Sequence, residues 1–137
     1  MIFIDTSFFL AVFSRRDQWH EKAMAYLAKN PIQRQPSDLF VTTNYVMFET
    51  ITVLRAKAGH ALAVSAGEDL LGRKMARIHR ASEEEEQAAF EYLKKYRDQD
   101  YSPVDCLSFV VMDRLGINEA LSFDAHFSHR FLVRTLT

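Results

Sequence analysis

Short apolar runs alternate with longer stretches of helical periodicity along this chain of 137 residues. The short runs favour β-strands, and they lie at 1–4, 39–42, 76–80, 120–123 and, as a shorter run, 131–133. Between them apolar residues recur at helical spacing, which predicts helices at 6–13, 18–27, 44–57, 61–71, 83–97 and 103–115. Because strands that alternate with helices form parallel sheets covered on both faces, the pattern predicts an α/β fold.

Several of these helices have start signals in the sequence. Asp17 can N-cap the second helix, and Thr43 or Asn44 can cap the third. Ser82 followed by Glu85 has the spacing of a capping box, in which each residue bonds to the backbone of the other. These signals fix where the helices should begin.

The helix predicted at 103–115 is marked at both ends. Ser102 precedes it, Pro103 occupies its first position, and Gly116 follows its last residue. Its apolar residues lie nearly all round the helix, so we expect the helix to be buried.

Composition narrows the class of protein. A chain of this length with 48% hydrophobic residues can form one domain, predicted to span residues 1–137. The net charge of −1 gives no overall attraction to nucleic acid, although a metal ion could supply positive charge locally. The single cysteine, Cys106, cannot form an intrachain disulfide. With no signal-peptide pattern and no apolar run long enough to cross a bilayer, we expect a cytoplasmic protein without membrane contact.

Two acidic residues directly follow predicted strands. Asp5 ends the first apolar run, and Asp124 ends the run at 120–123. The carboxyl ends of the strands are where open α/β sheets bind ligands. A carboxylate in this position can also cap the next helix, so Asp5 alone would be a weak signal. The repetition of the pattern at Asp124 favours a functional role.

Two further acids lie on predicted helices. Glu49 falls on an apolar stripe of the third helix, where a glutamate needs a partner, either a functional ligand or an arginine. Asp105 is the third residue of the helix that follows Ser102, where a carboxylate completes a capping arrangement and can also hold a ligand. We predict that Asp5, Glu49, Asp105 and Asp124 converge on one pocket.

Such a pocket predicts a divalent metal. Clustered carboxylates repel one another, which raises their pKa values, and a bound Mg²⁺ or Mn²⁺ keeps them ionised. The chemistry that follows is hydrolysis of a phosphodiester by a metal-activated water. The hydroxyls of Thr6, Ser7 and Ser102 could orient a phosphate or this water, and helix capping is an equally good explanation of them.

Four segments together resemble the PIN-domain ribonucleases, and in particular the VapC-type toxins of bacterial toxin–antitoxin pairs. The segments are Phe3-Ile4-Asp5-Thr6-Ser7, Thr42 to Val46 with Glu49-Thr50, Ser102-Pro103-Val104-Asp105-Cys106, and Ala120 to Phe127. The resemblance covers essentially the whole chain.

This resemblance implies a three-layer α/β/α domain with a parallel five-stranded sheet, and a Mg²⁺- or Mn²⁺-dependent ribonuclease. It places Asp5, Glu49, Asp105 and Asp124 as the acidic quartet that is both catalytic and metal-binding, with Asp5 and Asp105 as the most direct metal ligands. It also implies an RNA substrate, a homodimer and inhibition by a small antitoxin protein.

Three features depart from the family pattern, one of which is that the segment 128–131 lacks a glycine often found there. Phe48 stands where related sequences often carry an acid, and Val104 replaces a threonine that commonly precedes the third acid. The alternative hypothesis is therefore a catalytically silent PIN domain that serves as an RNA- or protein-binding scaffold. Histidines at 20 and 126 are expected to pack or bond locally, and Cys106 to be a small core residue.

Overall fold

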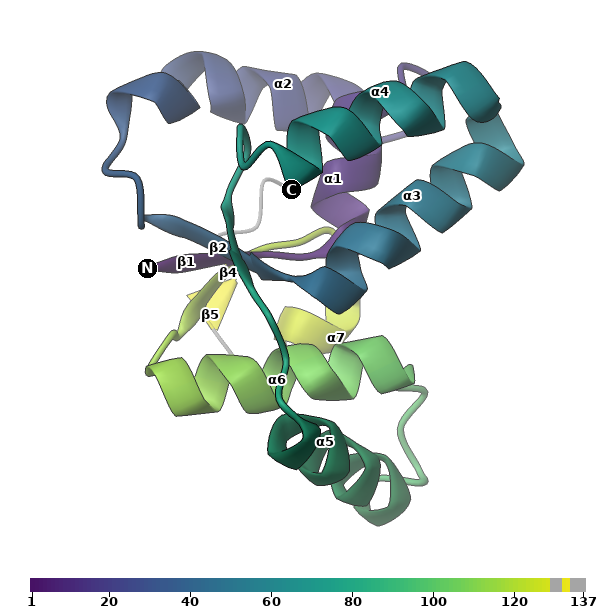
Figure 1. The fold of residues 1–137 in the computed structure, drawn as a ribbon, viewed down its shortest axis with the longest axis vertical. Helices are drawn as coiled ribbons and strands as arrows, with labels where there is room; N and C mark the ends of the chain where they lie inside the picture. Colours follow the sequence, from purple (N-terminus) through teal and green to yellow (C-terminus); the bar gives the residue numbers. More distant parts are fainter. Residues whose placement is uncertain (129–131, 134–137) are drawn as a thin grey trace.

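A parallel sheet runs through the centre of the molecule (Figure 1). The computed structural model describes residues 1–128 and the backbone of residues 132–133. The strand order is β3-β2-β1-β4-β5, so β1 is central and is flanked by β2 and β4. The strands are β1 (Ile2–Ile4), β2 (Phe40–Thr43), β3 (Arg77–His79), β4 (Glu119–Leu121) and β5 (Leu132–Val133).

The predicted α/β class and the parallel sheet are confirmed. Four strands of three or four residues lie within residues 1–128, whereas β5 contributes only two residues at the edge. Phe131, where the fifth strand was predicted to start, lies outside the described residues. The sheet therefore has four strands within residues 1–128, and the two-residue strand β5 pairs in parallel with β4 as the fifth, edge strand.

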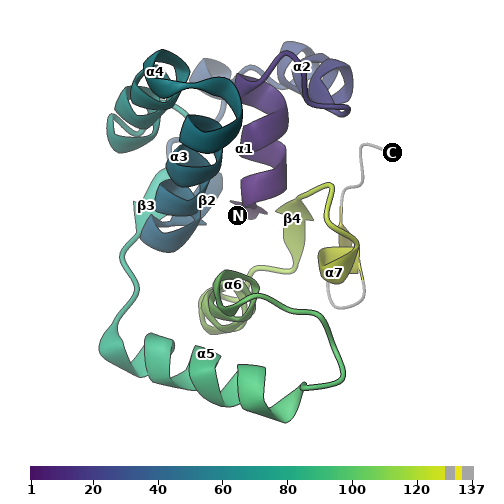
Figure 2. The same ribbon diagram turned by 90° about the vertical axis from the view of Figure 1, so that its right-hand side faces the viewer.

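Helices cover both faces of the sheet (Figures 1 and 2). On one side lie α1 (Thr6–Phe13), α2 (His20–Lys29), α3 (Asn44–Ala58) and α4 (His60–Leu71). On the other side lie α5 (Glu83–Lys95), α6 (Pro103–Leu115) and the short α7 (Ala125–Ser128). None of the helices in the described part of the chain has the length and apolar character that crossing a bilayer requires.

The helix boundaries follow the sequence signals closely, with one exception. Thr43 caps α3, and Ser82 with Glu85 forms the capping box of α5. Asp17 does not cap α2, because its Oδ1 accepts a bond of 2.8 Å from the amide of Trp19 and the helix begins only at His20. Asp17 closes the turn before the helix, a role that short polar side chains share with capping.

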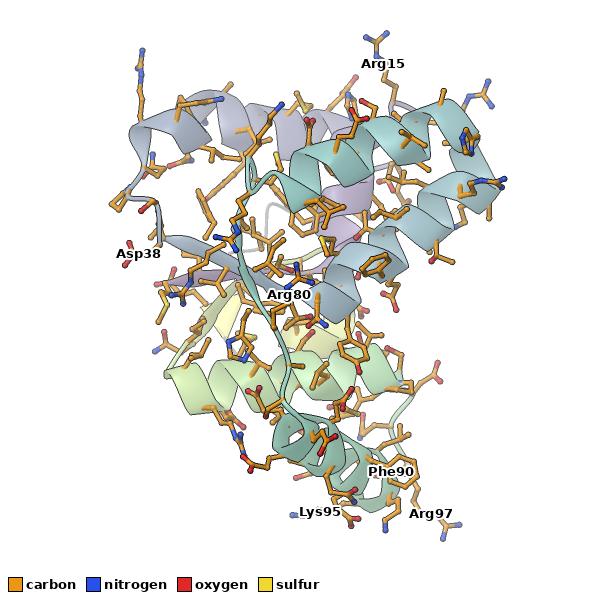
Figure 3. The ribbon with its side chains drawn as sticks, viewed as in Figure 1. Arg15, Asp38, Arg80, Phe90, Lys95 and Arg97 are labelled. Carbon is orange, nitrogen blue, oxygen red and sulfur yellow. The ribbon has the colours of Figure 1, made fainter. Side chains whose placement is uncertain are left out.

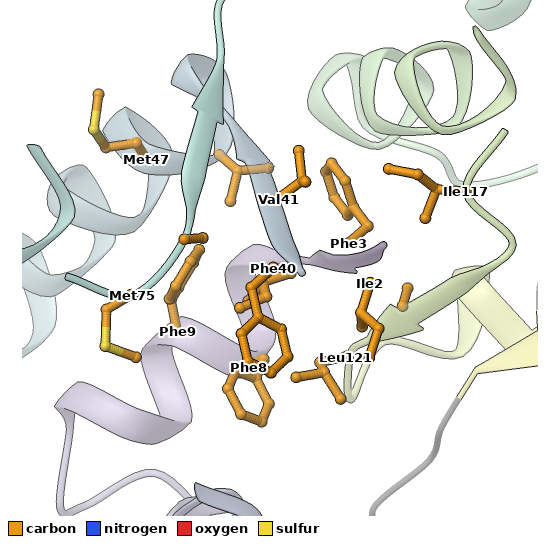
Figure 4. Packing of buried hydrophobic residues seen from close by; sticks show 14 of the residues in the cluster. Ile2, Phe3, Phe8, Phe9, Phe40, Val41, Met47, Met75, Ile117 and Leu121 are labelled. Atoms are coloured by element: carbon orange, nitrogen blue, oxygen red, sulfur yellow. The ribbon is translucent and has the colours of Figure 1, made fainter. Parts of the chain in front are cut away.

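The core lies between the sheet and the helices on either face (Figure 4). Every residue of β1 and β2 is buried, which explains why these strands read as continuous apolar runs without alternation. Phe3, Phe8 and Phe9 are fully buried and join the central strand to α1. This packing fixes the start of α1 against the carboxyl end of β1.

Candidate active site

The strand order brings the two acids that follow strands to neighbouring positions. Because β1 and β4 pair in parallel, Asp5 and Asp124 both lie at the same edge of the sheet. The amide of Asp5 donates a bond of 3.1 Å to the carbonyl oxygen of Leu121, which ties the two strand ends together. Figure 2 views the molecule from this edge, where α1, α3 and α6 also begin.

The Asp5 carboxylate is buried and held by three donors. Its Oδ2 accepts from the amide of Ser7 at 3.3 Å, from the Ser7 hydroxyl at 2.9 Å and from the Ser122 hydroxyl at 3.0 Å. Burial, together with repulsion from Asp105, raises the pKa of Asp5 from 3.8 to about 7, even though these bonds lower it. The ionised Asp5 carboxylate is therefore unfavourable in free energy unless a positive charge lies beside it.

Ser7 and Ser122 also hold the loop that carries Asp124. The Ser7 hydroxyl accepts a bond of 2.9 Å from the amide of Phe123, and the Ser122 hydroxyl accepts one of 2.9 Å from the amide of Asp124. Each hydroxyl thus donates to Asp5 and accepts from a backbone amide, that of Phe123 for Ser7 and that of Asp124 for Ser122. Ser122 is not among the site residues predicted from the sequence, where its only signal is a hydroxyl inside an otherwise apolar run.

Asp105 lies in the first turn of the buried helix α6, near the same carboxyl ends of the strands. Its carboxylate accepts from the amide of Ser102 at 3.1 Å, while its own amide donates to the Ser102 hydroxyl at 3.0 Å, which forms the predicted capping box. Burial and the charge of Asp124 raise the pKa of Asp105, whereas the bonds from Ser102 and His126 lower it. Asp105 is therefore both a helix cap and a member of the acidic site.

His126 lies between two of the carboxylates. Its Nδ1 is 3.3 Å from Asp105 Oδ2 and 3.4 Å from Asp124 Oδ1. Ligand atoms of Asp105, Asp124 and His126 all lie within 4.8 Å of one another, so the three could hold a metal ion. From the sequence, His126 is predicted only to pack or bond locally, and its position two residues after Asp124 is the signal that it belongs to the site.

Glu49 completes the acidic group from α3. It is half-buried, and burial together with the charges of Asp105 and Asp124 raises its pKa. The buried Thr6 hydroxyl lies near enough to Glu49 to lower that pKa, yet it forms no hydrogen bond of regular geometry with any described residue. The buried Thr6 hydroxyl oxygen is thus free to accept a further hydrogen bond, or to bind a cation, next to Glu49.

The four predicted acids therefore lie close enough to affect one another electrostatically. Asp105 raises the pKa of both Asp5 and Glu49, and Asp124 raises that of both Glu49 and Asp105. The three residues whose possible ligand atoms lie within 4.8 Å of one another are Asp105, Asp124 and His126, and Asp5 is not among them. The oxygen-rich donor set and the unpartnered Thr6 hydroxyl both fit a hard divalent cation.

Of the three hydroxyls predicted to orient a phosphate or a water, two have protein partners. Ser7 bonds to Asp5 and Phe123, and Ser102 belongs to the capping box of α6. Thr6 remains the hydroxyl with unused bonding capacity. Cys106, next to Asp105, is fully buried as expected, and burial with the nearby carboxylate raises its thiol pKa to about 11, which excludes a ready nucleophile.

A wide cavity lies away from these acids. It has a volume of about 580 Å³ and lies where α1 ends, against α3 and α4. Its lining combines apolar side chains such as Phe13 and Leu54 with the charged side chains of Arg15, Arg16, Asp17 and Lys57. None of the four predicted acids lines this cavity.

Comparison with known proteins agrees with this geometry. The PIN-domain family model matches residues 2–130. The 23S rRNA-specific endonuclease VapC20 of Mycobacterium tuberculosis, from strains CDC 1551 and H37Rv, is 36% identical over 128 residues, which is 93% of this chain and 92% of the relative. The crystal structure of M. tuberculosis VapC20, described as a Sarcin-Ricin loop cleaving toxin, superposes with a TM-score of 0.83 at 35% identity and covers 94% of both chains. On its sequence, its fold and the arrangement of its acidic residues, this chain belongs to the PIN-domain family.

Proposed function

We propose that this protein is a metal-dependent endoribonuclease and the toxin of a toxin–antitoxin pair. The observation that carries the proposal is the convergence of Asp5, Glu49, Asp105 and Asp124 at one edge of the sheet, where the pKa values of the first three are raised. Perturbed carboxylates gathered at one site are typical of catalytic centres. The similarity to VapC20 over nearly the full length supports the same activity.

The acidic residues would have two roles, which are to bind the metal ion and to accept a proton. Asp5, Asp105 and Asp124 would hold Mg²⁺ or Mn²⁺ through their carboxylate oxygens, with His126 beside them. A bound divalent cation would supply the positive charge that lowers the pKa of a water and offsets the charge of the phosphate. Glu49, half-buried and with a raised pKa, would accept the proton of the attacking water at its carboxylate.

The proposed substrate is the sarcin–ricin loop of 23S ribosomal RNA, the target named for VapC20. Unstacked bases in RNA loops are what proteins read most readily, and a loop can bend into a site flanked by three helix ends. The proposed partners are a small antitoxin protein and a second copy of the chain, in the cytoplasm.

The decisive experiment uses protein purified free of any antitoxin. We expect the wild type to cut intact ribosomes or total RNA at a discrete position in 23S rRNA with Mn²⁺, and to cut nothing with EDTA. Primer extension would map the cut, and light scattering would give the mass of the particle in solution. A folded protein that binds RNA without cutting it would instead support the silent scaffold.

A second prediction concerns Ser122. Replacing Ser122 by Ala removes the donor to Asp5 and the acceptor for the amide of Asp124 in one step. Because groups that orient metal ligands typically contribute about 10- to 100-fold, we expect RNA cleavage to fall by about tenfold or more. Replacement by Thr, which keeps the hydroxyl, serves as the matched control, and equal loss in both variants would point to packing rather than orientation.

A further inference from the structure

Parallel aromatic rings lie against the loop that carries Asp124. The ring of Phe123, the residue before Asp124, is stacked on the indole of Trp19, with centroids 5.1 Å apart and planes only 2° from parallel. The same phenyl ring is stacked on Phe8 of α1, at 6.1 Å and 11°. Phe8 is fully buried, whereas Trp19 and Phe123 are partly buried. We call Phe8, Trp19 and Phe123 the aromatic stack.

Trp19 is held in place by its own surroundings. Its amide donates a bond of 2.8 Å to Asp17 Oδ1, which closes the turn before α2. The next residue, His20, places its Nδ1 2.7 Å from the carbonyl oxygen of Ala11 on α1, and because a carbonyl only accepts, the imidazole donates. The ammonium of Lys22 lies 5.0 Å from the centre of the indole ring. These contacts fix the turn that presents Trp19 to Phe123.

The backbone of Phe123 is held by the acidic site itself. Its amide donates a bond of 2.9 Å to the Ser7 hydroxyl, which in turn donates to Asp5 Oδ2 at 2.9 Å. The following amide, that of Asp124, donates to the Ser122 hydroxyl, which also bonds to Asp5. A displacement of the Phe123 ring would therefore disturb the backbone that these two hydroxyls hold.

The loop between β4 and α7 depends on such contacts for its order. Residues 122–124 join the two elements and belong to neither. Outside regular structure, the contacts that side chains make decide how closely a segment is held. A ligand that is already held in its binding position loses little conformational freedom when a cation binds, and affinity rises accordingly.

We propose that Trp19 is a positioning residue for the acidic site, and that it acts together with Phe8 by clamping Phe123, so that the Asp124 carboxylate is held where it can serve as a metal ligand. The inference rests on the divalent cation of the proposed function, and Asp124 is one of the residues whose geometry suits that cation. Stacking of parallel rings fixes both the separation and the tilt of Phe123, which contact with an aliphatic side chain would not do.

The experiment measures the affinity of the purified protein for Mn²⁺ by isothermal titration calorimetry, without RNA. Groups that orient metal ligands contribute about 10- to 100-fold to affinity, so we expect Trp19→Ala to bind Mn²⁺ about tenfold more weakly than wild type. Trp19→Phe keeps an aromatic ring and should retain the wild-type affinity. Trp19→Leu keeps an apolar side chain without a ring and should lose about as much as Trp19→Ala.

A second readout comes from Trp19 itself, because it is the single tryptophan of the chain. Coupling between two sites is reciprocal, so a stack that strengthens cation binding must be strengthened by the cation. We expect Mg²⁺, which is not paramagnetic, to reduce the quenching of Trp19 fluorescence by acrylamide, with the midpoint that calorimetry gives for Mg²⁺. Asp124→Asn, which removes the charged ligand from the loop, should abolish this protection.

Phe13 provides the matched control for the loss of a stacked ring. It is partly buried and stacks on Phe9 at 6.4 Å and 23°, at the opposite end of α1 from Asp5. Phe13→Ala should lower the temperature of thermal unfolding, as Trp19→Ala should, because both remove packed aromatic surface. It should leave the affinity for Mn²⁺ unchanged.

The outcomes separate the role of Trp19 from the proposed function. Wild-type Mn²⁺ affinity in Trp19→Ala, or an equal loss of affinity in Phe13→Ala, would overturn the positioning role and leave the ribonuclease proposal standing. If wild type binds Mn²⁺ but cuts no RNA, the ribonuclease proposal fails and the titrations still decide the role of Trp19. If wild type binds no divalent cation, the metal site and the positioning role are both wrong.

Discussion

Replacing Asp5 by Asn is expected to lower the rate of RNA cleavage by about 100-fold or more while the protein stays folded. Asn has nearly the shape of Asp, so its side-chain oxygen can still accept from Ser7 and Ser122. It cannot carry the negative charge that a divalent cation requires, and losing an electrostatic contact at a reacting centre typically costs at least this much.

The measurement is the single-turnover rate of cutting of 23S rRNA with saturating Mn²⁺, with circular dichroism to verify the fold. Asp38→Asn is the matched control, because Asp38 is exposed and lies before β2, at the opposite end of the strands from the acids (Figure 3). If Asp5→Asn cleaved RNA at the wild-type rate, Asp5 would not be a catalytic residue. If Asp38→Asn lost as much cleavage rate as Asp5→Asn, the loss would not be specific to the acidic site.

The second large effect is on stability and its dependence on pH in the absence of divalent cations. Asp5 has a pKa of about 7 when folded and an ordinary value of 3.8. Between these values the folded protein holds more protons than the unfolded chain, so the contribution of Asp5 to the free energy of unfolding falls as pH rises. The fall is complete above about pH 7 and amounts to at most ~4 kcal/mol.

Comparison with Asp5→Asn isolates this contribution from every other titrating group. In EDTA we expect the variant to unfold at a higher urea concentration than wild type at pH 8, and the two to converge near pH 4. Glu85, whose pKa is lowered by bonds from Ser82 and His79, acts in the opposite direction in both proteins and therefore cancels. A difference that does not change with pH would show that Asp5 is not destabilised by its surroundings.

Addition of Mn²⁺ should reverse the order at pH 8. A ligand that binds only the folded state raises stability by mass action, so millimolar Mn²⁺ should raise the unfolding midpoint of wild type and have much less effect on Asp5→Asn. Calorimetry of both proteins with and without Mn²⁺ gives the result. The acidic site would then be a place where stability is given up for binding, as is common at functional sites.

The sequence by itself determined the local elements and the identity of the acids. Short apolar runs located each strand in the described part of the chain within a few residues, and the pairs Ser82–Glu85 and Ser102–Asp105 located two helix starts. These features depend on residues within one helical turn, so a single stretch of sequence contains all the information they need. The failure at Asp17 has the same origin, because one side chain can either cap a helix or close the turn before it.

Only the tertiary structure decided which of these residues meet. Ser122 donates to Asp5 across 117 positions of sequence, and His126 reaches Asp105 across 21. Nothing local to either residue encodes those contacts, because they depend on β4 pairing beside β1 and on α6 packing against the sheet.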